Sequence, residues 1–239
     1  DLHSFPTRRS SDLTNGRLVD KTDMAGGQSQ TDADDPIFGG RRDEFVAMLD
    51  DFMGRVSAIR ARLRAERGED PVEHCLGRVK SAASLHEKCR RKDLPETPEA
   101  AFEHVRDIIG IRVVCAFLND VYLMRDSIAE LPGVEVACEK DYIRHVKPNG
   151  YRSLHLVLLV DGRTYIEVQI RTISQDTWAA LEHQMKYKHE VAGDVSLITA
   201  ELKRCADELA STDISMQTIR DMIRGTIPRD VVAVREDGQ

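Results

Sequence analysis

The chain has 239 residues and a formal net charge of −7, and 41% of its residues are hydrophobic. This is the composition of an ordinary globular protein with one sizeable core. No apolar run approaches the roughly 20 residues that a membrane-spanning helix needs, which excludes a spanning protein. Cysteines without a C-x-x-C pair indicate a reducing cytoplasm, and the acidic balance argues against a protein that coats nucleic acid by charge alone.

Both ends of the chain are expected to be tails. Residues 1–40 are rich in Ser, Thr, Asp and Gly and lack hydrophobic periodicity, which predicts a disordered segment. Within it, residues 4–13 read SFPTRRSSDL, which looks like the translation of a sequencing-library adapter, so we exclude this run from fold reasoning. Residues 227–239 are expected to form a flexible tail, which leaves one folded domain over 41–226.

The first part of that domain predicts helices that lead into a strand. Hydrophobic residues at steps of three and four predict an amphipathic helix over 45–63, which Gly and Pro at 68–71 would end. A short helix is expected over 81–92. The sequence Thr-Pro-Glu at 97–99 opens another helix, with an N-cap, a first-turn proline and an acidic residue. It leads into 108–117, whose β-branched residues predict a buried strand.

The second part predicts further strands and then helices. A helix capped by Asn119 is expected to end at Pro132-Gly133, and a strand follows over 134–143. Asp161-Gly162 is a tight-turn signal, and the two strands around it should be 154–160 and 164–170. Three helices complete the chain: 173–189, 197–211 and 214–224. This order predicts an α+β fold with a mixed β-sheet flanked by helices.

A first group of polar residues begins at Arg78-Val79-Lys80-Ser81. On a helix that starts near Ser81, Ser84 and Lys88 share one face and Lys80 sits at the N-terminal end. Exposed amides, the helix dipole and cationic side chains together favour a polyphosphate. Lys and Arg are more often solvated surface residues, so this pattern alone leaves both interpretations open.

A second feature is the stretch 140–155, which is basic in an acidic chain and holds a Pro-Asn-Gly turn followed by Tyr151. A turn that carries Lys, Asn and an aromatic ring can hold phosphates and stack a base. The alternative is a plain loop whose Tyr151 packs into the core, and the sequence favours neither.

Two acidic residues lie in apolar strand contexts. Asp107 precedes the strand at 108–117. Alternation puts Glu167, Gln169 and Arg171 on one face of their strand and the apolar residues on the other. Carboxylates that converge from two strands suit Mg²⁺, which takes one or two of them together with substrate phosphates. The alternative is a solvent-exposed polar sheet face.

Together these features resemble the synthetase domain of the RelA/SpoT-type alarmone, (p)ppGpp, synthetases. The resemblance runs from Arg78 to about Arg220 in six ordered motifs: R-V-K-S, D-I-I-G-I-R, K-D-Y-I, K-P-N-G-Y-R-S-L-H, E-V-Q-I-R-T and W-A-A-L-E-H-Q-M-K-Y-K. It implies a nucleotidyltransferase-like synthetase fold. It also implies a reaction in which the β,γ-pyrophosphate of ATP moves to the ribose 3′-hydroxyl of GDP or GTP.

The resemblance implies a role for each residue of the motifs. Arg78 and Arg112 would sandwich the adenine of ATP. Asp107 and Glu167 would bind Mg²⁺, and Glu167 would also take the proton of the 3′-hydroxyl, with Gln169 beside that hydroxyl. The residues that would hold the ATP phosphates are Lys80, Ser84 and Lys88.

For the acceptor nucleotide, GDP or GTP, the resemblance implies that Tyr151 stacks on guanine. Four further residues would position the nucleotide and its phosphates: Lys140, Lys147, Asn149 and His155. The chain has no His-Asp dipeptide, on which the hydrolase domain of long members depends, so no hydrolysis of (p)ppGpp is expected. The expectation is a small, stand-alone alarmone synthetase.

Two other interpretations stay open. The first is a toxic relative that uses the same residues on an adenine nucleotide or on the 3′ end of tRNA, although a tRNA acceptor would need a broader basic surface than a net charge of −7 suggests. The second is a non-catalytic nucleotide-binding module. The presence of both Asp107 and Glu167 argues against the second, because a module that only binds nucleotide could lose the metal carboxylates.

Small members of this family are often homotetramers built through terminal helices, so a homo-oligomer is expected. The helix over 45–63 and the positions Leu202, Leu209, Ile214 and Ile219 would either form such an interface or cover the sheet. Feedback activation by (p)ppGpp is expected from the resemblance only. No membrane and no stable nucleic-acid partner are expected.

Overall fold

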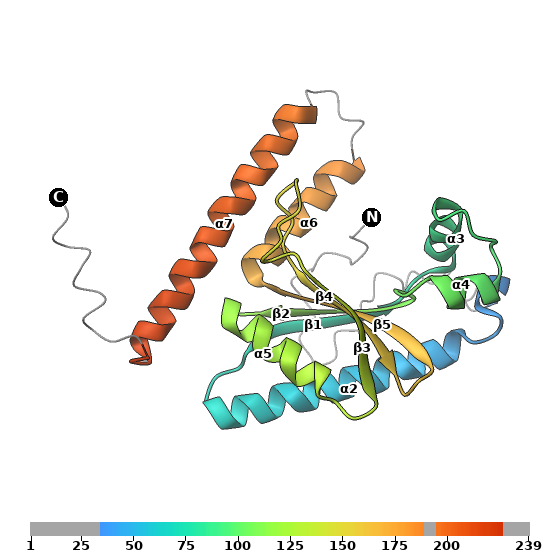
Figure 1. The fold of residues 1–239 in the computed structure, drawn as a ribbon, viewed down its shortest axis with the longest axis horizontal. Coiled ribbons are helices and arrows are strands. Elements are labelled where there is room, and N and C mark those ends of the chain that lie inside the picture. The colour runs from blue at the N-terminus through green and yellow to red at the C-terminus, as the bar shows by residue number, and fades with distance from the viewer. Residues whose placement is uncertain (1–33, 189–194, 227–239) are drawn as a thin grey trace.

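A five-stranded sheet forms the centre of the structure, a computed structural model that describes residues 34–188 and 195–226 (Figure 1). In sheet order the strands are β1 (Val72–Val79), β2 (Ile109–Cys115), β5 (Thr164–Thr172), β4 (Leu154–Val160) and β3 (Val134–Asp141). β2 and β5 are parallel, and the other neighbouring pairs are antiparallel. The predicted α+β fold with a mixed sheet is therefore confirmed.

Two helices cover one face of this sheet (Figure 1). α2 (Arg42–Arg67) packs on β1, and α5 (Leu118–Ala129) packs on β2 and β5. The apolar stripe of α2 is buried against the sheet, as its spacing of three and four predicts, and Gly68 ends the helix with a φ of 73°. Of the two predicted roles for this stripe, interface or cover, the structure shows that it covers the sheet.

The remaining helices lie at the two ends of the sheet (Figure 1). α3 (Ala82–Arg91) and α4 (Pro98–His104) lie together at one end. Thr97 caps α4 as predicted, and Ser81 caps α3. α6 (Ile173–Lys188) and α7 (Val195–Ile223) lie at the other end, on the opposite side of the sheet from α2. A second, smaller apolar cluster is formed by Trp178 of α6, Ala206 of α7 and Tyr151, and it packs the two helices against the segment that precedes β4.

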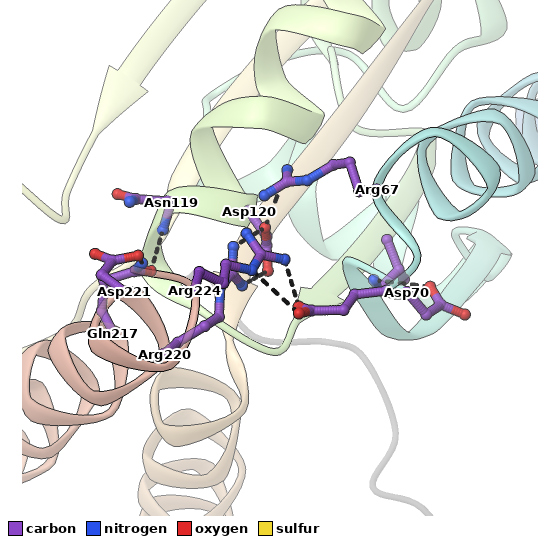
Figure 2. Close-up of polar contacts among 10 residues, drawn as sticks. Arg67, Asp70, Asn119, Asp120, Gln217, Arg220, Asp221 and Arg224 are labelled. Atoms are coloured by element: carbon purple, nitrogen blue, oxygen red, sulfur yellow. Dashed lines mark hydrogen bonds and ion pairs between the residues drawn. The ribbon is translucent and has the colours of Figure 1, made fainter. Parts of the chain in front are cut away.

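The C-terminal end of α7 is attached to the rest of the fold by buried charges (Figure 2). Arg220 donates two hydrogen bonds to Asp120 in the first turn of α5, at 2.5 and 3.0 Å. Arg67 at the end of α2 lies 3.4 Å from the same carboxylate. Because Asp120 is almost fully buried, its charge needs these partners, and the network fixes α7 to both helices of the covered face.

The second and third of the three predicted C-terminal helices form one helix. α7 continues through 212 and 213, where the side chains form hydrogen bonds with the backbone or with a neighbouring strand and do not cap a helix end. Thr212 donates to the carbonyl of Glu208, and Asp213 accepts a 2.6 Å hydrogen bond from Thr172 at the end of β5. Because the Asp213 side chain is engaged by Thr172, it does not break the helix between 211 and 214 as the prediction of two helices requires.

Asn119 is not the N-cap of α5. The helix begins at Leu118 after Phe117, so Asn119 lies in its first turn. Its backbone N–H is one of the donors that a helix leaves without an intrahelical partner, and Gln217 of α7 accepts it at 3.1 Å. A side chain distant in sequence thus supplies the cap that Asn119 was expected to provide.

The predicted N-terminal tail extends too far. Residues 1–33 lie outside the described residues, as do 227–239, but Pro36–Phe38 form a 3-10 turn (η2) with Asp35 as its N-cap. Ile37 and Phe38 are fully buried in the main core. A turn of three residues is too short to produce hydrophobic periodicity, so the pattern in the sequence could not reveal it.

β1 is absent from the sequence prediction because Gly77 and several polar residues interrupt its pattern. A Cβ at position 77 would lie 2.7 Å from Leu49 Cδ1 on α2, so the glycine permits the close approach of this helix to the strand. Within 34–188 and 195–226, no helix is long and apolar enough to cross a membrane.

Gly150 is expected to be essential for the packing of α7. Its φ is 92°, and a Cβ there would lie 2.7 Å from Ala206 Cβ and 3.0 Å from Lys203 Cα. Gly150→Ala should lower the free energy of unfolding by on the order of 2–4 kcal/mol, from backbone strain together with overpacking. Gly162→Ala is the matched control, because its φ is 65° and nothing lies within 4 Å. Equal losses in urea denaturation would contradict the close-packing argument.

Candidate active site

Four predicted site residues form one row across the sheet, on the face opposite α2 and α5. The register pairs Arg112 with Gln169, Gln169 with His155, and His155 with Lys140. Directly paired residues point to the same face of a sheet, so side chains from β2, β5, β4 and β3 lie next to one another. Residues that are far apart in sequence are therefore neighbours here.

The adjacent row joins Arg78 of β1 to Glu167 of β5. Both are paired with Gly110 of β2, which lies between them and has no side chain. The residues predicted to bind ATP and the predicted base therefore face the same region of the sheet. The two rows together contain six of the thirteen predicted site residues.

A cluster of charges lies where β1 ends and β2 begins. Lys80 follows β1 directly, and its backbone N–H donates to the carbonyl of Ile108 at 2.8 Å. The side chains of Lys80 and Lys88 contact Asp107 Oδ2 at 3.3 and 2.9 Å. Burial would raise the pKa of Asp107, but the two ammonium groups outweigh this effect and hold that pKa below its usual value.

The N-terminus of α3 lies beside these lysines. Ser81 caps the helix, because its hydroxyl accepts the backbone N–H of Ser84 at 3.3 Å. The same hydroxyl donates to Ser84 Oγ at 2.9 Å, which places the Ser84 side chain at the helix end. A helix N-terminus with two adjacent ammonium groups is a favourable place for a polyphosphate.

Asp107 and Glu167 could hold an oxygen-coordinated divalent cation. Asp107 Oδ1 is buried and has no hydrogen-bond partner in the described part of the chain, so one acceptor is left for another ligand. The negative charge of Asp107 also acts to raise the pKa of Glu167, which shows that the two carboxylates interact. Among residues 34–188 and 195–226 no group of three or more His, Cys, Asp or Glu could hold a metal, so the remaining ligands would be phosphate and water.

Glu167 is oriented by two neighbours from its own face of the sheet. Gln169 Nε2 donates to Glu167 Oε2 at 3.1 Å, and His155 Nδ1 lies 3.4 Å from Oε1. Burial would raise the pKa of Glu167, but the contacts with His155 and Gln169 lower it overall, so the carboxylate is ionised at neutral pH.

A hydrogen-bonded chain continues from Glu167 to Tyr151. Burial lowers the pKa of His155, so its ring is neutral at pH 7. An ionised carboxylate only accepts, which assigns the proton to Nδ1 and leaves Nε2 to accept from the Tyr151 hydroxyl at 2.9 Å. The predicted acceptor residue Tyr151 is thereby linked to the predicted base through His155.

In this structure the side chains of Lys147, Asn149 and Tyr151 are packed against their neighbours. Tyr151 is fully buried and its ring contacts the rings of Tyr142 and Trp178. Lys147 Nζ lies 4.3 Å from the centre of the Tyr142 ring, and Asn149 Oδ1 accepts the Tyr151 N–H at 3.2 Å. Because the Tyr151 ring is covered on all sides in this structure, a base could stack on it only after the surrounding side chains move, so the stacking role remains a prediction.

The sequence analysis missed two acidic residues of α6 that support the site. Asp176 contacts Arg112 at 3.3 Å, and Glu182 accepts a hydrogen bond from Asn149 at 3.4 Å while it is 2% exposed. Both lie on the helix face that carries Ala179, at steps of three. This spacing of carboxylates with a buried alanine is the signal that could have identified them.

The polar face of β5 is buried. Gln169 is 3% and Arg171 0% exposed, so the alternative of a solvent-exposed sheet face is wrong. Large, buried polar groups on one side of a sheet need either mutual pairing or a bound ligand. Here the pairing is partial: Gln169 donates to Glu167 and Arg171 forms an ion pair with Asp176, but Gln169 Oε1 has no hydrogen-bond partner among the described residues.

The family of the chain follows from comparison with known proteins. Residues 77–192 match the model described as a region found in RelA / SpoT proteins. The GTP pyrophosphokinase YwaC of Bacillus subtilis (strain 168) is 37% identical over 180 residues, which cover 72% of this chain and 85% of the relative. YjbM, another GTP pyrophosphokinase of that organism, is 33% identical over 71% of this chain and 82% of its own.

Solved structures agree with this result. Small alarmone synthetase 1 from Bacillus subtilis, bound to its product pppGpp, has a TM-score of 0.66 and 29% identity over 75% of this chain and 94% of its own. Small alarmone synthetase 2 from the same organism has a TM-score of 0.64 and 34% identity over 74% and 95%. The fold, the order of the motifs and the extent of these matches show that the chain belongs to the RelA/SpoT family, among the small alarmone synthetases.

Proposed function

We propose that the chain is a pyrophosphokinase that moves the β,γ-pyrophosphate of ATP to the ribose 3′-hydroxyl of GDP or GTP. One observation carries this proposal. Lys80 and Lys88, which can bind phosphates, lie on the same face of the sheet as Glu167, whose carboxylate is ionised and oriented by Gln169. The names of the relatives, both GTP pyrophosphokinases, and the pppGpp bound to the Bacillus protein support it.

Lys80, Lys88 and the N-terminus of α3 would bind the ATP phosphates, with Ser84 at the helix end. In this structure one carboxylate, that of Asp107, pairs with both lysines and leaves one positive charge in excess, and a polyphosphate would be the larger anion that compensates it. Phosphoryl-type transfer depends mainly on positioning and on neutralising negative oxygens, which is what these groups supply. Arg78 and Arg112 would hold the adenine between their planar guanidinium groups.

The cation in this proposal is Mg²⁺, held by Asp107 and Glu167. When bound, it neutralises negative phosphate oxygens. The buried Oδ1 of Asp107 without a hydrogen-bond partner in the described residues supports this assignment. Without a cation, Lys80 and Lys88 lower the pKa of Asp107 and keep it ionised, which is the form that binds Mg²⁺.

Glu167 would act as the base for the 3′-hydroxyl proton. Its carboxylate is ionised, and the hydrogen bond from Gln169 and the contact with His155 fix its direction. Lys140, Lys147, Asn149 and His155 would position the acceptor around it. Activation by (p)ppGpp and a location in the cytoplasm rest on the resemblance and stay predictions.

A transfer assay tests the reaction and the acceptor. Protein would be incubated with Mg²⁺, γ-labelled ATP and, separately, GDP, GTP, GMP, ADP and deacylated tRNA. Label is expected in guanosine tetra- or pentaphosphate, with release of AMP. Label in an adenosine product or in tRNA would move the chain to the toxic relatives. Binding of ATP without transfer to any acceptor would support the non-catalytic module.

In the same assay, Glu167→Gln should reduce turnover by on the order of 10²–10⁴-fold while ATP and GDP still bind, because the amide cannot take the proton. Glu135→Gln, an exposed residue of β3, is the matched control and should leave turnover unchanged. Turnover near the wild-type value in Glu167→Gln would refute the assignment of the base.

Two substitutions separate ring stacking at Tyr151 from its hydrogen bond. Tyr151→Phe keeps the ring and loses only the bond to His155, so the KM for the acceptor should change little. Tyr151→Leu removes the ring and should raise that KM by on the order of tenfold, the value of a lost base-stacking contact. The KM for ATP serves as the internal control. Equal increases in both variants would argue against stacking.

We also propose that the chain forms a homo-oligomer through α7. Leu202 and Leu209 pack in the small cluster at Tyr151, whereas Ile214 and Ile219 remain exposed. Met216, Ile219 and Ile223 are exposed at steps of three and four and form an apolar stripe. Light scattering should show an oligomer that Ile219→Glu dissociates and Val46→Glu on α2 does not. A monomeric wild-type chain would contradict this interface.

A further inference from the structure

Asp176 lies between two arginines beneath the site. Its Oδ1 is 3.3 Å from Arg112 Nη1 and 2.8 Å from Arg171 Nη2. Its Oδ2 is 3.8 Å from His74 Nε2 on β1. Arg112 belongs to the row of site residues with Gln169, and Arg171 follows Gln169 on the same face of β5.

One carboxylate here compensates two buried guanidinium groups. The side chain of Arg112 is 6% exposed and that of Arg171 is fully buried. Burial lowers the pKa of Arg112 to about 9, the positive charge of Arg171 adds to this effect, and Asp176 opposes it. Removing Asp176 would therefore leave two adjacent cations in a place with little solvent.

A reciprocal cap fixes the start of α6, the helix that carries Asp176. Thr172 and Gln175 form a reciprocal cap at the start of α6: Gln175 N–H donates to Thr172 Oγ1 at 3.2 Å, and Thr172 N–H donates to Gln175 Oε1 at 3.1 Å. Asp176 is the next residue, in the first turn, where the helix dipole favours a negative charge. Its carboxylate is thus held at a defined place relative to β5.

Of the two arginines, Arg112 is the one beside the site. Arg171 is fully enclosed, and its guanidinium nitrogens have no hydrogen-bond partner among the described residues, so its contact with Asp176 is a plain ion pair. Arg112 lies next to Gln169, and Arg78 is among the charges that lower its pKa, so the two predicted adenine residues are near each other.

We propose that Asp176 is a positioning residue that holds the Arg112 guanidinium for stacking on the adenine of ATP. Asp176 contacts one terminal nitrogen of the Arg112 guanidinium, Nη1 at 3.3 Å, and a guanidinium can stack on a base through its planar face. The proposal rests on the proposed function, since the family resemblance assigns adenine to Arg112. Asp176 itself makes no contact with substrate in this account and acts through Arg112.

The first test is Asp176→Asn, with Asp51→Asn on α2 as the control on the opposite face of the sheet. Calorimetry would measure the dissociation constants of a non-hydrolysable ATP analogue and of GDP, and kinetics would give both KM values. Asp176→Asn should weaken the ATP analogue by on the order of ten- to a hundredfold, the effect of a misplaced binding group, with GDP nearly unchanged. Equal weakening of both ligands would overturn the proposal.

A charge-balanced pair of variants separates positioning from simple charge compensation. Arg171→Gln alone keeps the contact between Asp176 and Arg112, so ATP binding should stay close to wild type. The double variant Asp176→Asn, Arg171→Gln removes one charge of each sign and should recover thermal stability, while ATP binding stays weak. Recovery of ATP binding in the double variant would show that Asp176 only balances Arg171, and would overturn the proposal.

These measurements also distinguish this proposal from the proposed function. A wild-type chain that binds the ATP analogue but transfers label to no acceptor refutes the pyrophosphokinase reaction. The effect of Asp176→Asn on binding of the analogue is still measured in that case, and it decides the role of Asp176 separately.

Discussion

The alternation of side chains along β5 is the constraint on which the rest of the site depends. Ile166, Val168 and Ile170 must face the core beneath α2 and α5, because their burial supplies much of the driving force for folding. With a period of two, Glu167 and Gln169 can then only point to the opposite face. The hydrophobic core thereby determines where the carboxylate lies, and neighbouring strands supply the groups that orient it.

Local signals were enough to predict most of the fold. Thr97-Pro98, the turn at Asp161-Gly162 and the stripe of α2 all depend on residues within one element, and the structure confirms each of them. The errors arise where a distant residue decides the outcome. Gln217 takes the role of a cap at Asn119, and Thr172 removes the helix break at Asp213.

The same contrast between local signals and distant contacts holds for the residues of the site. Motifs identified Lys80, Lys88 and Asp107, and the structure brings these three together because β1 and β2 are paired at that end. The spacing along α6 could have marked Asp176 as an inward-facing residue, but it could not show that its partner is Arg112, since the contact joins α6 to β2. The sequence also left Tyr151 undecided between core and ligand. In the structure Tyr151 is fully buried among Trp178, Ala206 and Tyr142, so the core interpretation describes this conformation and its stacking on a base stays a prediction.

The parallel pairing of β2 with β5 links catalytic competence to the completion of folding. β3 and β4 lie between these two strands in the chain, so the pair is a long-range contact that forms late in a growing or refolding polypeptide. Lys80, Lys88 and Asp107 precede the end of β2, whereas Glu167 arrives only with β5. With the proposed roles, a chain that still lacks β5 would hold Lys80, Lys88 and Asp107 without the proposed proton acceptor, so transfer would require the completed sheet.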